Sequence, residues 1–244
     1  MNFTSETWLI LCIYILYLSD STRLVVHNQL ILTKYSGRWR VICPDSRWII
    51  LKKIPYFMPI FFPGALVFCS TWSVTDRISN TYESNTLDGF INAISPLNYC
   101  AVLLFILMCI CMPVSIFIYG TGLAFLSIVL AIYTTILVML GLLYRKRYQL
   151  EISNKAYISL MFDCIACPPF AINLVRKITW QYPIKFNPVD FALKNLSVED
   201  FRNLIDSLIS RLDLQLLSLE DNTTQYIRLL AYKEILSEFY NECK

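Results

Sequence analysis

The chain has 244 residues, of which 56% are hydrophobic and only 16% charged, and its formal net charge is +3. An ordinary soluble domain contains about 45–50% apolar and about 25% charged residues. The excess is concentrated, because the 48 residues from Leu97 to Tyr144 include no Asp, Glu, Lys, Arg or His. This composition predicts an integral membrane protein and argues against a disordered chain, a collagen, a secreted disulfide scaffold or a free cytosolic enzyme.

A membrane anchor is predicted at the N-terminus, over residues 1–21. No Lys or Arg precedes its apolar run, Trp8–Leu18, and no small-residue cleavage site is present, so we interpret it as an uncleaved anchor and not as a signal peptide. Arg23 follows the run, which favours an N-terminus on the outside. As a helix, residues 3–18 are only about 24 Å long, so the span either continues to Asp20 or thins the bilayer.

Residues 22–96 are predicted to form a small β-rich segment that is cytoplasmic or peripheral to the membrane. Apolar and β-branched runs between turn residues predict an antiparallel meander, with strands at 24–26, 30–33, 38–43 and 48–51. In the third strand Arg38 and Arg40 point to one face. Together with Lys52 and Lys53 they form a basic surface that either rests on anionic lipid headgroups or is simply solvated, and the sequence leaves both interpretations open.

The apolar stretch over residues 54–75 is 22 residues long and uncharged, yet its prolines disfavour a helix. Pro55, Pro59 and Pro63 would each cost about 3 kcal/mol or more in a helix interior. A helix from Pro63 to Thr75 would be about 20 Å long, which is short for a membrane span. We therefore predict an extended or re-entrant segment packed against the other helices.

A transmembrane helical hairpin is predicted over residues 97–144. Leu97–Tyr119 and Gly122–Tyr144 have 23 residues each, so each helix is about 34 Å long and crosses a hydrocarbon core of ~30 Å. The short connection through Gly120 allows only an antiparallel pair. Pro113 is predicted to kink the first helix.

The distribution of basic residues favours three spans over four. Seven Lys or Arg residues lie between Asp20 and Lys53, and thirteen follow Tyr144, led by Arg145, Lys146 and Arg147. These two basic regions share one side of the membrane only if residues 54–75 do not cross it, and the positive-inside rule favours that arrangement. We therefore predict an external N-terminus and a cytoplasmic C-terminal part.

Residues 145–244 are predicted to form an interfacial and cytoplasmic helical domain. Residues 156–178 are interpreted as two short helices that lie along the membrane interface. A further helix begins at Pro188, and Ser197 to Asp200 form a variant capping box. Two later helices carry apolar residues at helical spacing, namely Phe201, Leu204, Ile205, Leu208, Ile209 and Leu212 in the first, and Ile227, Leu230, Ile235 and Phe239 in the second. The predicted fold class is thus mixed and mainly α-helical.

Cys164 and Cys167 are the only cysteine pair with a motif spacing, and a CxxC can be a redox pair or half of a metal site. The other half is missing, because there is no second CxxC and His27 is the single histidine. We favour small buried packing residues instead. Because hydrolase, phosphate-loop, zincin and dinucleotide motifs are also absent, we predict no enzymatic activity, no cofactor, no small-molecule substrate and no nucleic-acid partner.

Small side chains line one face of the second hairpin helix and would let another helix approach closely. They are Ala124, Ser127, Ala131, Thr134 and Thr135. The stripe could face the other spans or a second copy of the chain, and the sequence does not distinguish these. Because neither hairpin helix contains an ionisable residue, proton relays and charge-coupled transport are not expected.

Short segments along nearly the whole chain carry a family resemblance. They are Tyr17–Asp20, Gly37–Arg40, the run from Pro55 to Pro63 that leads to Trp72, the hairpin from Pro96 to Tyr144, and Cys167–Ile172 followed by Asn187 and Pro188. Together they resemble a family of bacterial inner-membrane proteins of unknown function. The resemblance implies three spans in the bacterial inner (plasma) membrane and no known activity, although similar proteins have a longer soluble stretch than residues 73–95 ahead of the hairpin.

The leading hypothesis is a membrane-anchored cytoplasmic interaction protein, either a scaffold or an accessory subunit, without enzymatic activity. It follows from the missing catalytic motifs and from the placement of nearly all polar mass on one side. Its partners would be the lipid bilayer and either another protein or a second copy. The alternative is a self-assembling membrane effector or pore, and a third hypothesis is a metal or redox enzyme built on Cys164 and Cys167.

Overall fold

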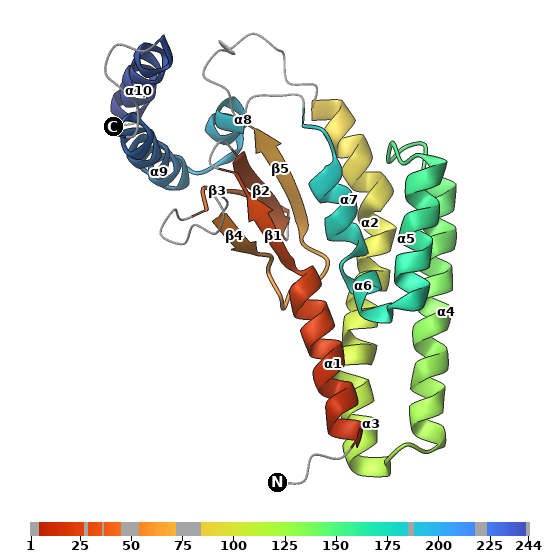
Figure 1. Cartoon of the computed structure of the whole chain (residues 1–244). Helices are drawn as coiled ribbons and strands as arrows, with labels where there is room; N and C mark the ends of the chain where they lie inside the picture. Colours follow the sequence, from red (N-terminus) through yellow and green to blue (C-terminus); the bar gives the residue numbers. More distant parts are fainter. Residues whose placement is uncertain are drawn as a thin grey trace. The chain divides into compact units, whose positions relative to one another are not determined.

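The computed structural model describes residues 5–26, 29–35, 37–44, 54–71, 84–184, 188–217 and 224–242. The chain is mostly helical and has a small antiparallel sheet (Figure 1). It divides into two compact units, which we name the helical unit and the sheet unit. The helical unit contains residues 1–23, 57–66 and 83–180, and the sheet unit contains residues 24–56, 67–82 and 181–244.

This division differs from the four consecutive segments predicted from the sequence. The N-terminal helix and the loop over residues 57–66 belong with the hairpin, whereas strands from the first third of the chain belong with the C-terminal helices. Composition changes mark the ends of the apolar segments, but each unit is held together by contacts between residues that are distant in sequence.

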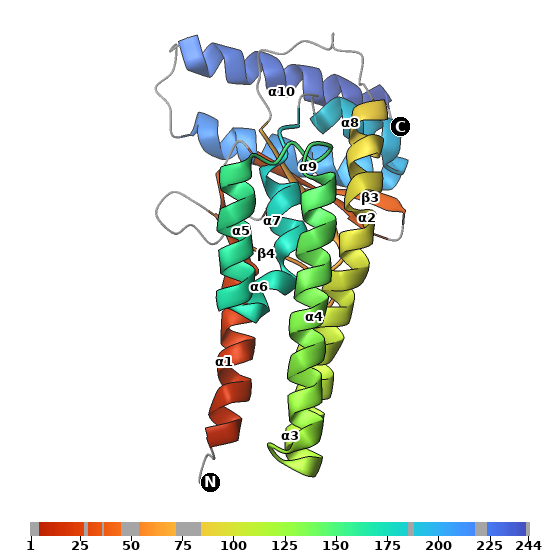
Figure 2. The ribbon, with the colours of Figure 1, turned by 90° about the vertical axis from the view of Figure 1, so that its right-hand side faces the viewer.

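Two helices of the helical unit are long and apolar enough to cross a membrane, Leu87–Tyr119 and Leu123–Lys146. They are the two arms of the predicted hairpin, and they lie side by side in both views (Figures 1 and 2). Helix α1 (Ser5–Asp20) is also apolar but shorter, with 16 residues. The predicted anchor is therefore a helix, and its passage through a membrane remains a prediction.

The first arm consists of α2 (Ser84–Ile106), the π-helical segment η1 (Leu107–Cys111) and α3 (Met112–Tyr119). It begins well before Leu97, where we expected it to start. The expected limit was set by the absence of charged residues, but Asp88 lies within the first turns of α2, exposed to solvent. A polar helical extension has no signature in hydropathy alone.

Pro113 lies directly after the π-helical segment, at the position where a kink was predicted. Proline has no backbone N–H and clashes with the carbonyl one turn earlier. In the wider π turn, the Met112 N–H bonds to the carbonyl of Leu107, five residues earlier. The predicted disturbance of the helix is therefore present as a π-helical turn ahead of the proline.

The turn between the two arms uses glycine as predicted. Gly120 has a φ of +67°, in the left-handed region that glycine adopts without steric cost. Helix α4 (Leu123–Lys146) starts after Gly122 and ends within two residues of the predicted boundary.

Residues 154–181 form three helices instead of the two predicted, α5 (Asn154–Ala166), α6 (Pro168–Ile172) and α7 (Leu174–Gln181). The Ser153 hydroxyl caps α5 by accepting the Ala156 N–H at 3.2 Å. Helix α5 runs beside α4 in both views (Figures 1 and 2). Its axis thus follows α4, which differs from the predicted helices lying flat along the membrane interface.

The strands form two small sheets. Strand β1 (Thr22–Val25) pairs with β4 (Ile54–Phe57), and the other sheet has the order β3 (Arg38–Ile42), β2 (Gln29–Tyr35), β5 (Leu66–Thr71). β1, β2 and β3 match predicted strands, β5 was missed, and the strand predicted at 48–51 lies outside the described residues. The predicted meander is wrong at its first strand, because β1 pairs with β4 and only β2 and β3 form the expected hairpin. The described part of 54–75 is therefore two strands and a loop, and the prediction that its prolines prevent a helix is confirmed.

Strand β3 alternates as its sequence predicts. Arg38 and Arg40 are exposed, whereas Trp39 and Val41 are partly buried. The Trp39 ring meets Phe191 of helix α8 (Pro188–Asn195) edge-on, with 4.9 Å between ring centroids, and it lies 6.0 Å from Phe68 of β5. These aromatic contacts fix the apolar face of β3 inside the sheet unit.

The core of the sheet unit lies between α8, α9 (Val198–Leu216), α10 (Thr224–Glu242) and Leu30 of β2. The Ser197 hydroxyl caps α9 by accepting the Asp200 N–H at 3.2 Å, as predicted. The predicted apolar stripe of α9 is buried, with Ile209 packed at its edge. The helix predicted over Thr224–Tyr240 is confirmed as α10. Of the apolar residues noted there, Ile227 and Leu230 are exposed, and Leu229, Tyr232 and Leu236 form the buried face.

Candidate functional site

Cys164 and Cys167 sit at the end of α5, and their surroundings do not support metal or redox chemistry. Cys164 is 1% exposed, and burial raises the pKa of its thiol to about 12. Burial also raises the pKa of Cys167, which caps the helix. A thiol that stays protonated at neutral pH is a poor nucleophile and a poor metal ligand.

A larger metal site is not formed in the described part of the chain. No group of three or more His, Cys, Asp or Glu side chains there is placed to hold an ion. His27 and Cys243 lie outside the described residues. Cys164 is buried near the end of α5 and Cys167 is partly exposed at that end, and their role as packing residues stays a prediction.

The predicted basic surface is divided between the two units. Arg38 and Arg40 are exposed on β3 of the sheet unit, whereas Arg145, Lys146 and Arg147 follow one another at the end of α4 in the helical unit. Lys52 and Lys53 lie outside the described residues.

Arg147 is held by aromatic neighbours. Its guanidinium lies 4.3 Å from the ring centroid of Tyr144 and 4.6 Å from that of Tyr148. It also donates a hydrogen bond of 2.7 Å to the Tyr148 hydroxyl, and this bond raises the pKa of Arg147. Tyrosine and arginine side by side at the end of an apolar helix are typical of the interface between lipid and water.

The small-residue stripe of α4 is not the face that packs inside the chain. The buried residues of α4 are Ile132, Ile136, Met139, Leu140 and Leu143. Ser127 and Thr134 are exposed, and Ala124, Ala131 and Thr135 are partly buried. The three hydroxyls donate to carbonyls of their own helix at 2.8 Å, so they do not join α4 to another helix.

The helical unit has a belt of exposed apolar residues, which on α2 begins sharply at Tyr99. We call this end of the belt its upper limit and the end near the Gly120 turn its lower limit. Between Leu87 and Asn98 of α2, where exposure is described, the exposed residues are Asp88, Gly89 and Asn92. From Tyr99 to Tyr119 every exposed residue is apolar or aromatic: Tyr99, Val102, Leu103, Ile106, Ile110, Val114, Phe117, Ile118 and Tyr119. We name this surface, with the apolar residues exposed on α1 and α4, the apolar belt.

The thickness of the apolar belt matches a bilayer. Val102–Tyr119 contains 18 residues, which as a helix measure about 27 Å, close to the ~30 Å hydrocarbon core of a membrane. On α1 the exposed apolar residues run from Trp8 to Leu18 and end just before Asp20. Water does not favour such a continuous apolar surface, so the belt is the largest candidate contact surface of the helical unit.

A buried polar network lies within the helical unit, close to the end of α1. Arg176 of α7 is fully buried and donates to the carbonyls of Pro59 and Phe62, the second at 2.8 Å. Its other amino group donates to the Asn173 Oδ1 at 2.9 Å. Asn173 in turn donates to the hydroxyl of Ser21 at 3.1 Å. The network thus ties α7, α1 and the loop over residues 58–65 together.

An ion pair lies at the rim of this network. The Lys177 ammonium is 3.0 Å from a carboxylate oxygen of Asp20 and 4.5 Å from the ring centroid of Phe170. Sequence reasoning missed the whole network, because Arg176 and Lys177 looked like ordinary surface charges after an apolar run. No local pattern in the sequence indicates this network, because Arg176 and the carbonyls of Pro59 and Phe62 lie 117 and 114 positions apart.

The sheet unit contains a hollow between β3 and α9, with a volume of about 280 Å³. One wall consists of the consecutive residues Arg40 to Cys43, and the other of four residues on one face of α9, namely Asp200, Asn203, Leu204 and Ser207. Sequence reasoning identified Arg40 but not this hollow, because α9 and β3 lie about 160 positions apart in the chain. We name this feature the β3–α9 groove.

The edge of β3 in this groove has outward-facing backbone groups. Tyr35 pairs with Arg38 across a two-residue turn, and the register continues to Ile31 and Ile42 without a bulge. In such a hairpin the pair next to the turn exchanges both hydrogen bonds, and bonded pairs then alternate with non-bonded ones. The N–H and C=O of Val41 therefore point away from β2, toward the edge of the sheet.

No family model matches the sequence, and no curated protein and no solved structure does so either. The fold class that the structure defines is a mainly helical protein with a small antiparallel sheet and two helices that are long and apolar enough to cross a membrane. The resemblance to bacterial inner-membrane proteins remains a prediction.

Proposed function

We propose that the protein is a membrane-anchored interaction protein without enzymatic activity, in which the helical unit is embedded in the bilayer and the sheet unit binds a protein partner. The observation that carries the proposal is the apolar belt. It has the thickness of a hydrocarbon core, and Tyr119 lies at its lower limit, a position that membrane proteins favour for tyrosine.

The proposed orientation in the membrane follows from the positions of the charged residues along α1 and α4. The turn at Gly120 and the start of α1 lie at the same end of the helical unit (Figures 1 and 2). Arg145 to Arg147 lie at the opposite end of α4. The positive-inside rule then places the turn and the N-terminus outside and the C-terminal helices in the cytoplasm. The resemblance assigns this topology to a bacterial inner membrane.

Membrane insertion is tested by extracting membranes that carry the protein with alkaline carbonate, followed by protease digestion of intact vesicles. The protein should stay in the membrane fraction, and a tag after residue 244 should be digested only when the cytoplasmic face is accessible. Release of the full-length chain into the carbonate supernatant would contradict the proposal, because peripheral proteins leave the membrane under these conditions.

The partner site that the geometry supports is the β3–α9 groove. An edge strand with outward N–H and C=O groups accepts an extended peptide as a further strand. The exposed guanidinium of Arg40 on one wall favours an acidic side chain in that peptide. The other wall carries the Asp200 carboxylate, which accepts a hydrogen bond from the Ser197 hydroxyl, and the neutral polar groups of Asn203 and Ser207. We therefore propose as the occupant an extended segment of a partner protein with a single acidic side chain opposite Arg40.

The substitution Val41→Pro tests this partner site. It removes the outward donor of β3, whereas the bonds between β2 and β3 are made by the neighbouring residues Arg40 and Ile42 and remain possible. Val41→Thr keeps the N–H and serves as the matched control. In native-level purifications from mild detergent, a partner that is recovered with wild type and Val41→Thr but lost with Val41→Pro would support the groove.

The same purification distinguishes the alternative of a self-assembling effector. Intact-mass measurement of the purified complex should give a hetero-complex. A homo-oligomer of fixed copy number whose mass is unchanged by Val41→Pro would contradict the interaction function and favour self-assembly through the lipid-facing helices. Ser127 and Thr134, which are exposed on α4, would then be the first positions for cross-linking.

A further inference from the structure

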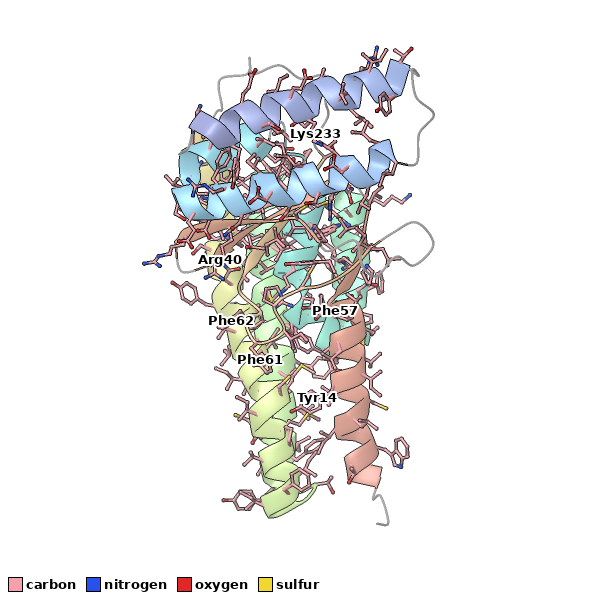
Figure 3. The ribbon with its side chains drawn as sticks, turned by 90° about the vertical axis from the view of Figure 1, so that its left-hand side faces the viewer. Tyr14, Arg40, Phe57, Phe61, Phe62 and Lys233 are labelled. Carbon is pink, nitrogen blue, oxygen red and sulfur yellow. The ribbon has the colours of Figure 1, made fainter. Side chains whose placement is uncertain are left out.

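The loop between β4 and β5 presents three phenylalanines outward. Phe57, Phe61 and Phe62 are 65%, 78% and 46% exposed, and Figure 3 labels Phe57 near the end of α1 and the other two on the side of the hairpin helices. Large aromatic side chains exposed together on one short loop are unusual in water. We name residues 57–62 the Phe loop.

The backbone of the Phe loop is tied down from inside the helical unit. The Tyr17 hydroxyl donates to the Ile60 carbonyl at 2.5 Å, and Arg176 donates to the carbonyls of Pro59 and Phe62. The Met58 N–H donates to the carbonyl of Ser21 at 3.1 Å. Side chains and backbone of α1 and α7 thus hold the loop in one shape while its rings point away from them.

Turns within the loop and its two prolines account for further backbone groups. The Phe62 N–H donates to the Pro59 carbonyl at 3.1 Å, and the Ala65 N–H donates to the Phe62 carbonyl at 2.9 Å. Pro59 and Pro63 have no N–H to satisfy. Non-helical backbone is tolerated next to lipid only where its polar groups are satisfied by protein. The Phe loop meets this requirement for the groups named here.

The position of the Phe loop coincides with the upper limit of the apolar belt. Its first half bonds to Tyr17 and Ser21, where the exposed apolar residues of α1 end. Beyond its second half, a Cβ added to Gly64 would lie 3.4 Å from Val102 and 3.6 Å from Asn98 on α2, where the exposed surface of α2 changes from polar to apolar. The loop therefore marks one depth on both helices.

We propose that the Phe loop enters the bilayer, with Phe57, Phe61 and Phe62 in the interfacial region of the lipid at the end of the apolar belt opposite to the Gly120 turn. The occupant is lipid because the exposed rings belong to a loop that lies at the depth where the exposed apolar surfaces of α1 and α2 end. The loop thus acts as a rigid aromatic wedge that fixes the depth of the helical unit without a fourth span. This inference rests on the proposed membrane insertion.

The test uses 4-trifluoromethyl-phenylalanine at position 61, a near-isosteric probe at an exposed site, in the full chain in nanodiscs of phosphatidylcholine and phosphatidylglycerol. Fluorine NMR linewidths are measured with a lipid that is spin-labelled near its headgroup and, separately, with a water-soluble gadolinium chelate. The same probe at Phe117, 75% exposed on α3, reports on the membrane-spanning part, and at Leu217, 84% exposed after α9, on water.

We expect the lipid spin label to broaden the signal at position 61 at least several-fold more than the gadolinium chelate does. Broadening of that signal by gadolinium alone, with Phe117 still protected, would overturn the Phe loop proposal and leave the membrane proposal standing. Broadening of both signals by gadolinium would overturn both. A signal at position 61 that neither agent changes would place the loop against protein and also overturn the lipid assignment.

Discussion

Leucine side chains are exposed along α4 but mostly buried along α9. The exposed face of α4 carries Leu126, Leu130 and Leu137, whereas the exposed face of α9 carries mainly polar residues such as Glu199, Asp206 and Ser210. Leu204, Leu208 and Leu212 of α9 are buried in the core. The hydrophobic effect drives apolar surface away from water in both cases. Under the proposed membrane insertion, the two units have different surroundings, lipid for the apolar belt and water for α9.

The largest expected effect is on the core of the sheet unit. Leu208 of α9 is fully buried among the core residues, so Leu208→Ala should lower the free energy of unfolding by about 2–5 kcal/mol, through lost burial and the cavity left behind. Ile227→Ala, at a site 58% exposed on α10, is the matched control and should change it by less than about 0.5 kcal/mol. Urea unfolding in mild detergent, followed by circular dichroism, measures both.

Equal effects of the two substitutions would contradict the buried face assigned to α10. They would indicate that Ile227 is covered in solution, by a partner or a second copy. The urea concentration at which each unfolding transition occurs distinguishes the two units. A substitution that destabilises only the sheet unit should leave the transition of the helical unit unchanged.

A charge on the lipid-facing side should produce the second effect. Leu130 is 69% exposed on α4 and lies near the middle of the apolar belt, so Leu130→Arg should disfavour membrane insertion by about 2.5–3.5 kcal/mol. Leu214→Arg, at a site 55% exposed on α9, adds the same charge to a surface in water and should be nearly neutral. The inserted fraction of each variant, measured with a translocon-based glycosylation reporter, gives the comparison.

If Leu130→Arg inserts as well as wild type, α4 does not face lipid at that position. The comparison between the two units would then fail, because the exposed leucines of both would be facing water or protein. This pair of substitutions thus tests the surroundings directly, without reference to the packing inside either unit.

Local patterns in the sequence predicted those parts of the fold that depend on neighbouring residues. The hairpin with its glycine turn, the Ser197 cap, the stripe of α9 and the alternation along β3 each follow from a few consecutive positions. The buried face of α10 was not predictable in this way, because apolar residues lie on more than one side of that helix. Only its packing against α9 selects Leu229, Tyr232 and Leu236.

The candidate sites were harder to predict than the fold, for a physical reason. Arg176 bonds to the carbonyls of residues that are 114 and 117 positions away, and the β3–α9 groove joins two segments that are about 160 positions apart. Hydrophobic periodicity predicts which face of a helix or strand is buried, but it does not predict which other element covers that face. The prolines that excluded a helix at 54–75 did, however, correctly indicate an unusual backbone there.

The third prediction concerns Arg176, whose removal should loosen the Phe loop. Arg176→Met fills similar space but removes the donors to Pro59, Phe62 and Asn173, at a cost of roughly 1–3 kcal/mol for each partner left without a bond. Because the two carbonyls also accept backbone N–H groups, we expect a total near the lower end. Thermal unfolding in nanodiscs gives the loss, and limited proteolysis between β4 and β5 reports on the loop.

Lys177→Met is the control for Arg176→Met, because Lys177 lies next to it but pairs with Asp20 at the rim. Because the two side chains are only 13% and 10% exposed, this variant leaves the Asp20 carboxylate largely buried without this partner and should also lower stability. It should nevertheless leave the loop resistant to protease, because Lys177 pairs with Asp20 and not with the loop. Equal sensitivity of both variants would show that the net charge of α7, and not the bonds of Arg176, holds the loop.

The smallest effect at neutral pH is expected at Tyr232, which is buried in the core of the sheet unit and whose ionisation makes the stability of that core depend on pH. Burial, and to a lesser extent the Asp190 carboxylate, raise the pKa of Tyr232 to about 12, from an ordinary value of about 10. A raised pKa means that the contribution of Tyr232 to stability is fully present below pH ~10 and is lost as the pH rises through about 12. The unfolding midpoint of wild type should therefore fall over this window.

Tyr232→Phe should lose that part of the pH dependence and differ little at pH 7, whereas Tyr148→Phe, at a site 79% exposed, should behave like wild type. Because both variants remove one phenol from the same chain, a difference in their alkaline transitions isolates burial between α9 and α10 as the cause, and identical transitions would contradict the packing of Tyr232 in that core.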